Sequence, residues 1–276
     1  MSPELLRAWE RRYGLLRPTR SEGGFRLYSE DDERRVATMR ANLDRGVSAA
    51  EAARLALAEP ASEAVISDDG APALVRGAGE LRDALDALDE TAGHAALDRM
   101  LAELSVPTVL EAVVLPYLRE LGHRWERGEV SVAQEHFASN LLRGRLLGLA
   151  RGWDGGAGPR ALLACPSGEL HDLALIAFGL ALRARGWRIT YLGADTPLST
   201  VGELAGVLRP DAVVLAATIA ERFTDDQAGL GSLAATAPLW LAGAGATAPV
   251  AQAAGARLLE DQAVEAADRI SAATRA

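Results

Sequence analysis

A glutamate and a histidine two residues apart follow an apolar segment near the middle of the chain. The segment 161–165 is typical of a buried strand, Pro166 and Gly168 end it, and Glu169 and His171 come next. A histidine on such a loop can present one imidazole nitrogen to a metal ion, while a nearby carboxylate accepts the other ring N–H and fixes the tautomer. Because so short a motif is weak evidence, a solvated loop histidine beside a helix-capping glutamate is the alternative.

The segments around this motif predict an α/β domain. Apolar positions over 173–182 follow the spacing of a helix packed against a sheet. Alternating strands and helices indicate a doubly wound parallel sheet of the Rossmann-like, flavodoxin-like type. Since open α/β sheets bind ligands at the carboxyl ends of their strands, Glu169 and His171 would lie where a ligand binds. The further strands are expected at 187–192, 212–218, 239–241 and 257–259.

A helical region precedes this α/β domain. Over 81–153 the apolar spacing is helical with three internal breaks, which predicts four helices packed as a bundle. Trp125 would end the third helix, and Glu135 and His136 would lie in the first turns of the fourth. A core tryptophan with two solvated polar residues is the plain interpretation of these three positions.

The N-terminal region differs from the rest of the chain in charge. The formal net charge is −9, yet residues 1–57 hold 11 arginines against 9 acidic residues, and residues 58–276 hold 18 against 29. A basic end on an acidic protein indicates a polyanionic partner for that end alone. A helix is expected over 2–13, and Gly23 and Gly24 then predict a two-residue hairpin.

The segment from Arg7 to Tyr28 carries a long motif. It reads R-x-W-E-R-R-Y-G-L-L-x-P-x-R-x-x-G-G-x-R-x-Y, which closely resembles the second half of a MerR-type winged helix-turn-helix. The resemblance implies that the helix over 2–13 lies in a major groove of DNA. Family members have one further helix before it, so residues 1–57 are expected to form this domain without its first helix. A solvated basic helix is the alternative. The residues expected to contact DNA are Arg7, Arg11, Arg12, Tyr13, Arg20, Arg26 and Tyr28.

Three motifs of the α/β region resemble those of a cobalamin-binding module. The family pattern D/E-x-H-x-x-G corresponds to Glu169 and His171, with Ala174 in place of the glycine. The pattern S-x-L corresponds to 216–218, and G-G corresponds to 242–243. The resemblance implies that His171 binds cobalt from below and that Glu169 orients its ring. The further cofactor contacts implied, near the nucleotide tail, are Ala216, Thr218 and Gly243.

The bundle resembles B12-dependent photoreceptor repressors of the CarH type. Trp125, Glu135 and His136 form the pattern W-x₉-E-H. The resemblance implies that these three residues cover the upper face of the corrin, over an adenosyl group. Light-sensing members have a histidine directly after this tryptophan, which can bind cobalt once light expels adenosine. Glu126 occupies that position in this sequence.

Together these features predict a multidomain α and α/β protein. The expected parts are a partial winged helix-turn-helix over 1–57, a linker over 58–78, a helical cap over 79–153 and a cobalamin-binding sheet domain over 154–276. The function implied by the resemblance is a cobalamin-dependent transcriptional regulator, a repressor with light as a candidate signal. It would bind adenosylcobalamin and operator DNA, form a homo-oligomer (a dimer or a tetramer) and lack enzymatic activity.

Composition narrows the setting, and two other functions stay open. No apolar run reaches about 18 residues, so no membrane span is expected. The first residues lack a signal-peptide pattern and Cys165 is the single cysteine, so a reducing cytoplasm is expected. A corrinoid carrier protein for methyl transfer would share the sheet and the cap. A degenerate regulator sensing another ligand or a protein partner would account for Ala174, Ala216 and Glu126.

Overall fold

The structure is a computed structural model of the 276-residue chain. It describes residues 6, 9–10, 12–16, 18–20, 26–27, 32, 35–36, 38–39, 49–58, 70–260 and 262–275. The chain divides into two compact units, Met1–Ser67 and Asp68–Ala276. Among the described residues, no helix is both long enough and apolar enough to span a membrane.

The first unit contains a short antiparallel strand pair and helical segments. β1 (Thr19–Arg20) pairs with β2 (Arg26–Leu27), which confirms the two strands expected on either side of Gly23 and Gly24. The two glycines themselves lie outside the described residues. The helix α3 spans Ala49–Ala58. A small apolar core holds the unit together, formed by Trp9, Leu15, Leu16, Met39, Ala52, Ala53 and Ala56.

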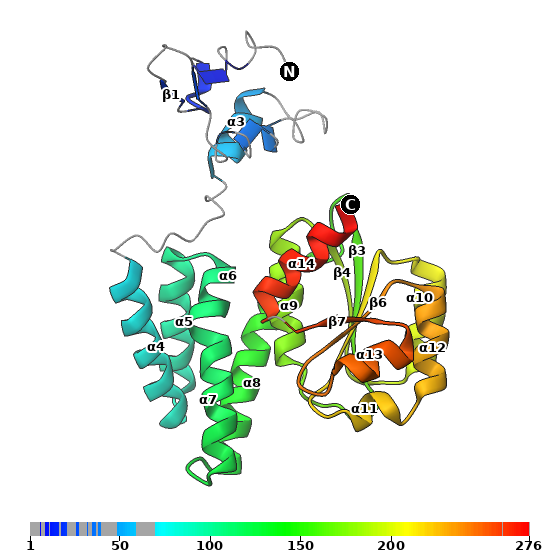
Figure 1. The fold of residues 1–276 in the computed structure, drawn as a ribbon. Coiled ribbons are helices and arrows are strands. Elements are labelled where there is room, and N and C mark those ends of the chain that lie inside the picture. Colours follow the sequence, from blue (N-terminus) through cyan, green and yellow to red (C-terminus); the bar gives the residue numbers. More distant parts are fainter. Residues whose placement is uncertain are drawn as a thin grey trace. The chain divides into compact units, whose positions relative to one another are not determined.

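The second unit begins with the predicted helical bundle. Its elements are α4 (Gly70–Asp86), α5 (Glu90–Glu103), α6 (Val106–Val109), the π-helical turn η1 (Leu110–Val114), α7 (Leu115–Glu126) and α8 (Val132–Leu149). Because α6, η1 and α7 follow one another without a break, they form one helical run, so the bundle has four helical members as expected (Figure 1).

One boundary differs from the sequence-based expectation. α4 begins at Gly70, inside the range 58–78 that was predicted to be a linker. Gly70 and Pro72 suggested irregular structure, but proline is compatible with the first turn of a helix, where its missing N–H has no intrahelical partner. Leu74, Leu81 and Leu85 are buried on one side of this helix, so packing in the bundle outweighs the local signal.

The second unit ends with a five-stranded parallel sheet in the order β4-β3-β5-β6-β7. This confirms the predicted doubly wound α/β fold. The strands are β3 (Arg160–Pro166), β4 (Arg188–Thr196), β5 (Ala212–Ala216), β6 (Leu239–Ala242) and β7 (Arg257–Leu259). The helices are α9 (Leu173–Ala184), α10 (Leu198–Leu208), α11 (Glu221–Thr224), α12 (Gln227–Thr236), α13 (Ala248–Ala254) and α14 (Ala263–Arg275).

Helices cover both faces of the sheet, as Figure 1 shows for α9 and α14 on one face and α10 and α12 on the other. The apolar core on the α9 face is continuous with that of the bundle, since Leu142 of α8 and Leu163 of β3 belong to one cluster. Cys165 is buried in this core, and burial raises the pKa of its thiol to about 12. The bundle and the sheet are therefore packed as a single unit.

Candidate ligand-binding site

The carboxylate of Glu169 organises the loop that follows β3. Its Oε1 atom accepts hydrogen bonds from the backbone N–H of His171 at 2.9 Å and from Nδ1 of His171 at 2.6 Å. Its Oε2 atom accepts from the backbone N–H and the hydroxyl of Thr218, both at 2.6 Å. Burial by itself raises the pKa of Glu169, but the hydrogen bonds from Thr218 and His171 outweigh it and lower the pKa from 4.5 to about 2.

These bonds decide which nitrogen of His171 can bind a ligand. An ionised carboxylate only accepts hydrogen bonds, so Nδ1 of His171 must carry the proton that it shares with Glu169. In the neutral imidazole this arrangement leaves the lone pair on Nε2, and the His171 side chain is 75% exposed. The expected contact between Glu169 and the ring of His171 is present. The hydrogen bonds of the Glu169 carboxylate described above go to His171 and Thr218, and the N-cap residue of α9 is Asp172. Binding of a metal by His171 stays a prediction.

The loop is also fastened to the neighbouring strand. The backbone N–H of Gly168 donates to Oδ1 of Asp195 at 2.7 Å, and the N–H of Asp195 donates to the carbonyl of Glu169 at 2.9 Å. Asp195 has a φ of 51°, in the left-handed region that non-glycine residues rarely adopt. These contacts explain why β4 continues to Thr196, four residues beyond the strand end expected from the sequence.

The loops after β5 and β6 pack closely beside this motif. Ala216 pairs with Ala242 in the sheet, and the N–H of Gly245 donates to the carbonyl of Ala217 at 3.0 Å. Gly243 has a φ of 87°, and a Cβ atom at this position would overlap the carbonyl group of Ala217. The structure therefore brings the predicted residues Ala216 and Gly243 to the edge of the sheet that carries Glu169.

Thr218 makes contacts that the sequence did not predict. Its backbone N–H and its hydroxyl both donate to the Glu169 carboxylate. Its predicted contact with a ligand stays a prediction. Its neighbour Ile219 and the residue before His171, Leu170, are large apolar residues with exposed side chains. The sequence did not single out these two residues. Apolar surface next to a free imidazole nitrogen is typical of a site that buries an organic ligand.

The bundle supplies the other three predicted cofactor-binding residues. Trp125 lies at the end of α7 and is 51% exposed, and Glu135 and His136 lie at the start of α8. Oε1 of Glu135 accepts a hydrogen bond from Ser139 at 2.7 Å, and Nε2 of His136 lies 3.5 Å from Oε2 of Glu135. In Figure 1 the turn between α7 and α8 lies at the same lower end of this unit as α11, which follows β5.

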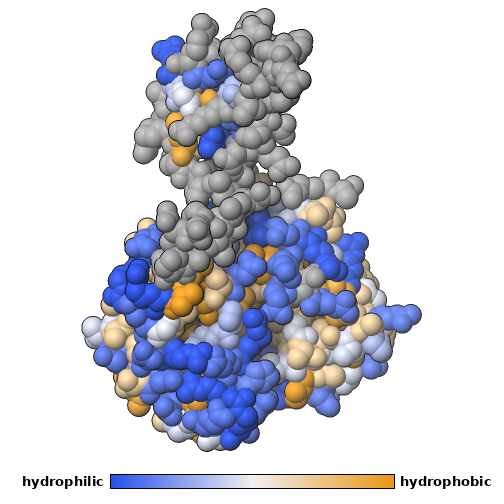
Figure 2. Space-filling view, turned by 60° about the vertical axis from the view of Figure 1, so that its left-hand side comes forward, coloured by the Kyte–Doolittle hydropathy of each residue, from blue (hydrophilic) through white to orange (hydrophobic). Residues whose placement is uncertain are grey.

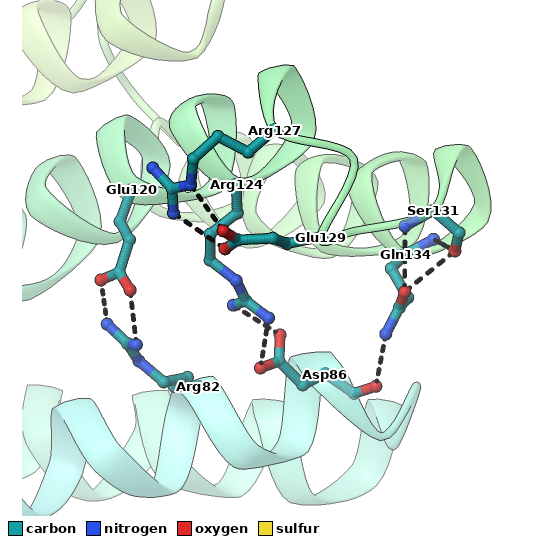
Figure 3. Close-up of polar contacts among 8 residues, drawn as sticks. All are labelled: Arg82, Asp86, Glu120, Arg124, Arg127, Glu129, Ser131 and Gln134. Carbon is teal, nitrogen blue, oxygen red and sulfur yellow. Dashed lines mark hydrogen bonds and ion pairs between the residues drawn. The ribbon is translucent and has the colours of Figure 1, made fainter.

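Polar contacts hold the α7–α8 segment against α4 (Figure 3). The Asp86 carboxylate accepts two hydrogen bonds from Arg124, at 3.0 and 2.9 Å, and its backbone carbonyl accepts one from Gln134 at 3.1 Å. Arg82 of α4 pairs with Glu120 of α7 one helical turn away. Arg124 precedes Trp125 and Gln134 precedes Glu135, so Asp86 supports both segments that carry the predicted upper contacts.

Two positions near Trp125 bear on the expected response to light. Glu126 lies directly after Trp125 at the end of α7, and its Oε2 atom lies 3.6 Å from Nδ1 of His123. Both side chains are largely exposed. The imidazole of His123 therefore lies beside the Glu126 carboxylate on its own helix.

A second buried carboxylate, Asp172, follows His171 directly. It accepts hydrogen bonds from Nε and Nη2 of Arg143, at 3.0 to 2.7 Å, and from the hydroxyl of Tyr191 at 2.6 Å. Burial, and then the hydrogen bond to Asp172, raise the pKa of Tyr191. Sequence reasoning missed these three residues, because Arg143 lies 29 positions before Asp172 and Tyr191 lies 19 positions after it.

The described residues include only part of the predicted DNA-binding set. The Arg12 side chain is exposed, with its guanidinium carbon 5.6 Å from the ring centre of Tyr13. Arg20 and Arg26 lie on the paired strands β1 and β2. Arg7, Arg11 and Tyr28 lie outside the described residues, so their predicted roles stay predictions.

Comparison with known proteins finds a matching family for the N-terminal region and another for the helical bundle. Residues 1–59 match the family described as MerR HTH family regulatory protein, and residues 78–147 match the family described as B12 binding domain. The HTH-type transcriptional repressor CarH of Myxococcus xanthus is 35% identical over 253 residues, which cover 88% of this chain and 85% of CarH. The repressor CarA of the same organism is 40% identical over 215 residues, which cover 76% of this chain and 70% of CarA.

The fold also has a counterpart among solved structures. The monomethylamine corrinoid protein of Methanosarcina barkeri superimposes with a TM-score of 0.59. The two proteins are 18% identical, and the match covers 68% of this chain and 94% of that protein. This likeness concerns the fold alone, and it supports the arrangement of a helical region before a Rossmann-like sheet.

Proposed function

The chain belongs to the family of MerR-type transcriptional repressors that carry a B12-binding domain, and from this premise we propose that its ligand is adenosylcobalamin, bound through Nε2 of His171. The chain is a cobalamin-dependent transcriptional regulator. Its relatives CarH and CarA are transcriptional repressors. The observation that supports His171 as the cobalt ligand is its hydrogen bond to Glu169, which leaves Nε2 available.

The donor set of the site fits a corrinoid. Among the described residues, no group of three or more histidine, cysteine, aspartate or glutamate side chains could hold a metal ion by itself. A single imidazole nitrogen suits a metal whose equatorial positions are filled by a macrocycle. His171 would be the lower ligand, Glu169 would hold its ring and raise its basicity, and Thr218 would hold Glu169.

The bundle would cover the opposite face of the ligand. Trp125 and the exposed Val132 offer apolar surface there, and Glu135 and His136 offer hydrogen-bonding groups to an adenosyl moiety. When bound, adenosylcobalamin supplies a cobalt–carbon bond that visible light can break. Trp125 would shield this part of the ligand from water, and Leu170 and Ile219 would do so around His171.

The N-terminal unit would bind operator DNA through the basic residues that the MerR resemblance implies. Arg12, Arg20 and Arg26 are those in the described part of the chain, on a helix and on two paired strands. Binding of adenosylcobalamin would change the assembly of the protein as a dimer or tetramer and thereby its hold on DNA. Light would reverse this change, unless Glu126 prevents the ligand exchange at cobalt.

The test is an absorption spectrum of the protein mixed with adenosylcobalamin in the dark, desalted, and measured again after green light. Wild type is compared with His171→Ala and with His123→Ala, which removes another exposed histidine. Retained corrin absorbance in wild type and in His123→Ala, with weaker retention or an altered cobalt spectrum in His171→Ala, is the expected result.

Other outcomes would change the proposal in defined ways. Retained corrin with an unchanged spectrum in His171→Ala would overturn the assignment of the lower ligand. Corrin that is retained in the dark but gives no stable light product on the protein would leave a cobalamin sensor without a light response. Loss of corrin from wild type on desalting would contradict adenosylcobalamin as the ligand.

A further inference from the structure

Asp172 is a buried charge whose strongest partner comes from the helical bundle. Its side chain is 3% exposed, and Arg143 of α8 donates to both of its oxygens. A carboxylate buried to this extent needs paired donors, because removing it from water is costly. The bundle therefore supplies the charge that allows Asp172 to lie at the start of α9, directly after His171.

Arg143 shares a helix with the predicted upper contacts to the ligand. Glu135 and Ser139 lie eight and four residues before it on α8, and Ser139 donates to Glu135 at 2.7 Å. Residues four apart lie on one side of a helix, so Glu135, Ser139 and Arg143 form one polar row. Glu135, at one end of this row, is a predicted upper contact to the ligand. Arg143, at the other end, bonds to Asp172, the residue after His171.

The chain that leaves α8 contacts the same cluster a second time. The ring of Trp153 meets that of Tyr191 edge to face, with centroids 5.7 Å apart and planes at 87°. The backbone carbonyl of Trp153 also accepts a hydrogen bond from Ile189 of β4 at 2.8 Å. Tyr191 is thus held by Trp153 through its ring and by Asp172 through its hydroxyl.

We propose that Arg143 and Tyr191, acting through Asp172, are positioning residues that hold the His171 loop at a fixed position relative to α8. The upper and lower contacts to one ligand then depend on each other, because a single helix supports both. This inference rests on the proposed function, since it assumes that His171 binds the ligand. Without the hydrogen bonds from the Arg143 guanidinium, Asp172 loses its charged partner, and the loop that carries His171 loses this contact with the bundle.

The variants compared are Arg143→Met, which keeps most of the side-chain volume, and the matched control Arg145→Met. Arg145 lies two residues further along α8 but pairs with Asp98 of α5, inside the bundle. Arg143→Lys keeps the charge without the two-pronged geometry and serves as the conservative rescue. His171→Ala is combined with Arg143→Met to test whether both act on one interaction.

Three readouts separate positioning from general stability: exchange at the His171 amide, the nitrogen signal of bound cob(II)alamin, and the affinity for cobalamin. Hydrogen exchange of the ligand-free full chain reports on the His171 amide, whose hydrogen bond to Glu169 depends on the loop conformation. Electron paramagnetic resonance of the protein loaded with cob(II)alamin reports nitrogen coordination through its hyperfine splitting. Arg143→Met is expected to speed exchange at His171, to weaken the nitrogen signal and to lower cobalamin affinity about tenfold or more.

The controls define what would overturn the inference. Arg145→Met should leave all three readouts near wild type, Arg143→Lys should restore them in part, and Arg143→Met should cause no further loss of affinity in the His171→Ala background. If wild type binds through His171 and Arg143→Met behaves like Arg145→Met, this inference fails while the proposed function stands. If wild type binds no cobalamin, the role in ligand binding fails together with the proposed function, and exchange at His171 alone then reports on the loop.

Discussion

Two glutamate–histidine pairs lie in the two halves of the candidate site, and they are built differently. In the sheet domain, Nδ1 of His171 lies 2.6 Å from Glu169, whose side chain is 2% exposed and accepts three further hydrogen bonds. In the bundle, Nε2 of His136 lies 3.5 Å from Glu135, and His136 is 69% exposed. Both histidine rings are exposed, but the ring of His171 is held by a hydrogen bond to a buried carboxylate, whereas His136 lies beyond hydrogen-bond distance of the less buried Glu135.

This difference indicates how the two halves contribute to binding. The buried Glu169 carboxylate holds the ring of His171 before a ligand arrives, so little ordering would be needed for Nε2 of His171 to bind the proposed ligand. The side chains of Trp125 and His136 are exposed and would gain contacts if the proposed ligand covers them. Changes in the sheet half should therefore affect folding and binding together, whereas changes in the bundle half should affect mainly binding.

The largest effect is expected at Glu169. Glu169→Ala would remove a buried carboxylate together with the four hydrogen bonds that it accepts from His171 and Thr218. The free energy of unfolding should fall by about 3 kcal/mol, and His171 should lose its fixed orientation. Urea denaturation of the full chain followed by tryptophan fluorescence checks this. If Glu169→Ala unfolds at the same urea concentration as wild type, the sheet half is not pre-organised as described.

The same carboxylate predicts a dependence of stability on pH. The folded-state pKa of Glu169 is lowered from 4.5 to about 2, so its ionised form stabilises the fold above about pH 4.5. This contribution, about 3 kcal/mol, should be lost as the pH falls from about 4.5 towards about 2. The measurement is the difference in unfolding free energy between wild type and Glu169→Gln. A difference that is constant across this pH range would contradict the assignment.

The next effect is expected at Gly243, where β6 meets the loop after β5. Gly243→Ala would place a Cβ atom against the Ala217 carbonyl in a left-handed backbone conformation, and should cost about 2 kcal/mol or more. The matched control is Gly206→Ala within α10, where no atom lies within 4 Å of the added carbon. This control should stabilise the protein by about 0.5–1 kcal/mol. Equal effects from the two variants would show that the two loops can separate freely.

Asp86 tests the support of the bundle half. Asp86→Ala removes the two hydrogen bonds to Arg124, and this partly buried pair should contribute about 1 kcal/mol to stability. Retention of adenosylcobalamin should fall as well, since Arg124 adjoins Trp125. Glu80→Ala breaks another ion pair of α4, that with Arg99, and should leave retention unchanged. Dark desalting followed by absorbance compares the two variants.

The smallest effect on stability is expected at Trp125. Its side chain is half exposed, so Trp125→Ala should change the free energy of unfolding by about 0.5 kcal/mol or less. Dark retention of adenosylcobalamin should nevertheless fall clearly. Val75→Ala, at another exposed apolar position of the bundle, should change neither property. A large loss of stability in Trp125→Ala would remove the contrast between the two halves.

Several features of this chain could be predicted from short-range patterns in the sequence. The strands β3, β5, β6 and β7 and the helix α9 follow from runs of apolar residues and from their spacing. The Glu169–His171 contact was predicted because two residues on one loop are neighbours in any fold. The extent of β4 and the start of α4 were not predicted, because each depends on packing against other elements.

The tertiary structure decided which distant residues meet at the site. Thr218 reaches Glu169 across 49 positions and Arg143 reaches Asp172 across 29, because β5 and β4 flank β3 and α8 packs against α9. Apolar periodicity determines which segments form strands and helices, but it does not specify their order in a sheet. The sequence by itself therefore determined the type of domain and the position of the histidine that we propose as metal ligand, and only the packing of strands and helices determined what holds that histidine in place.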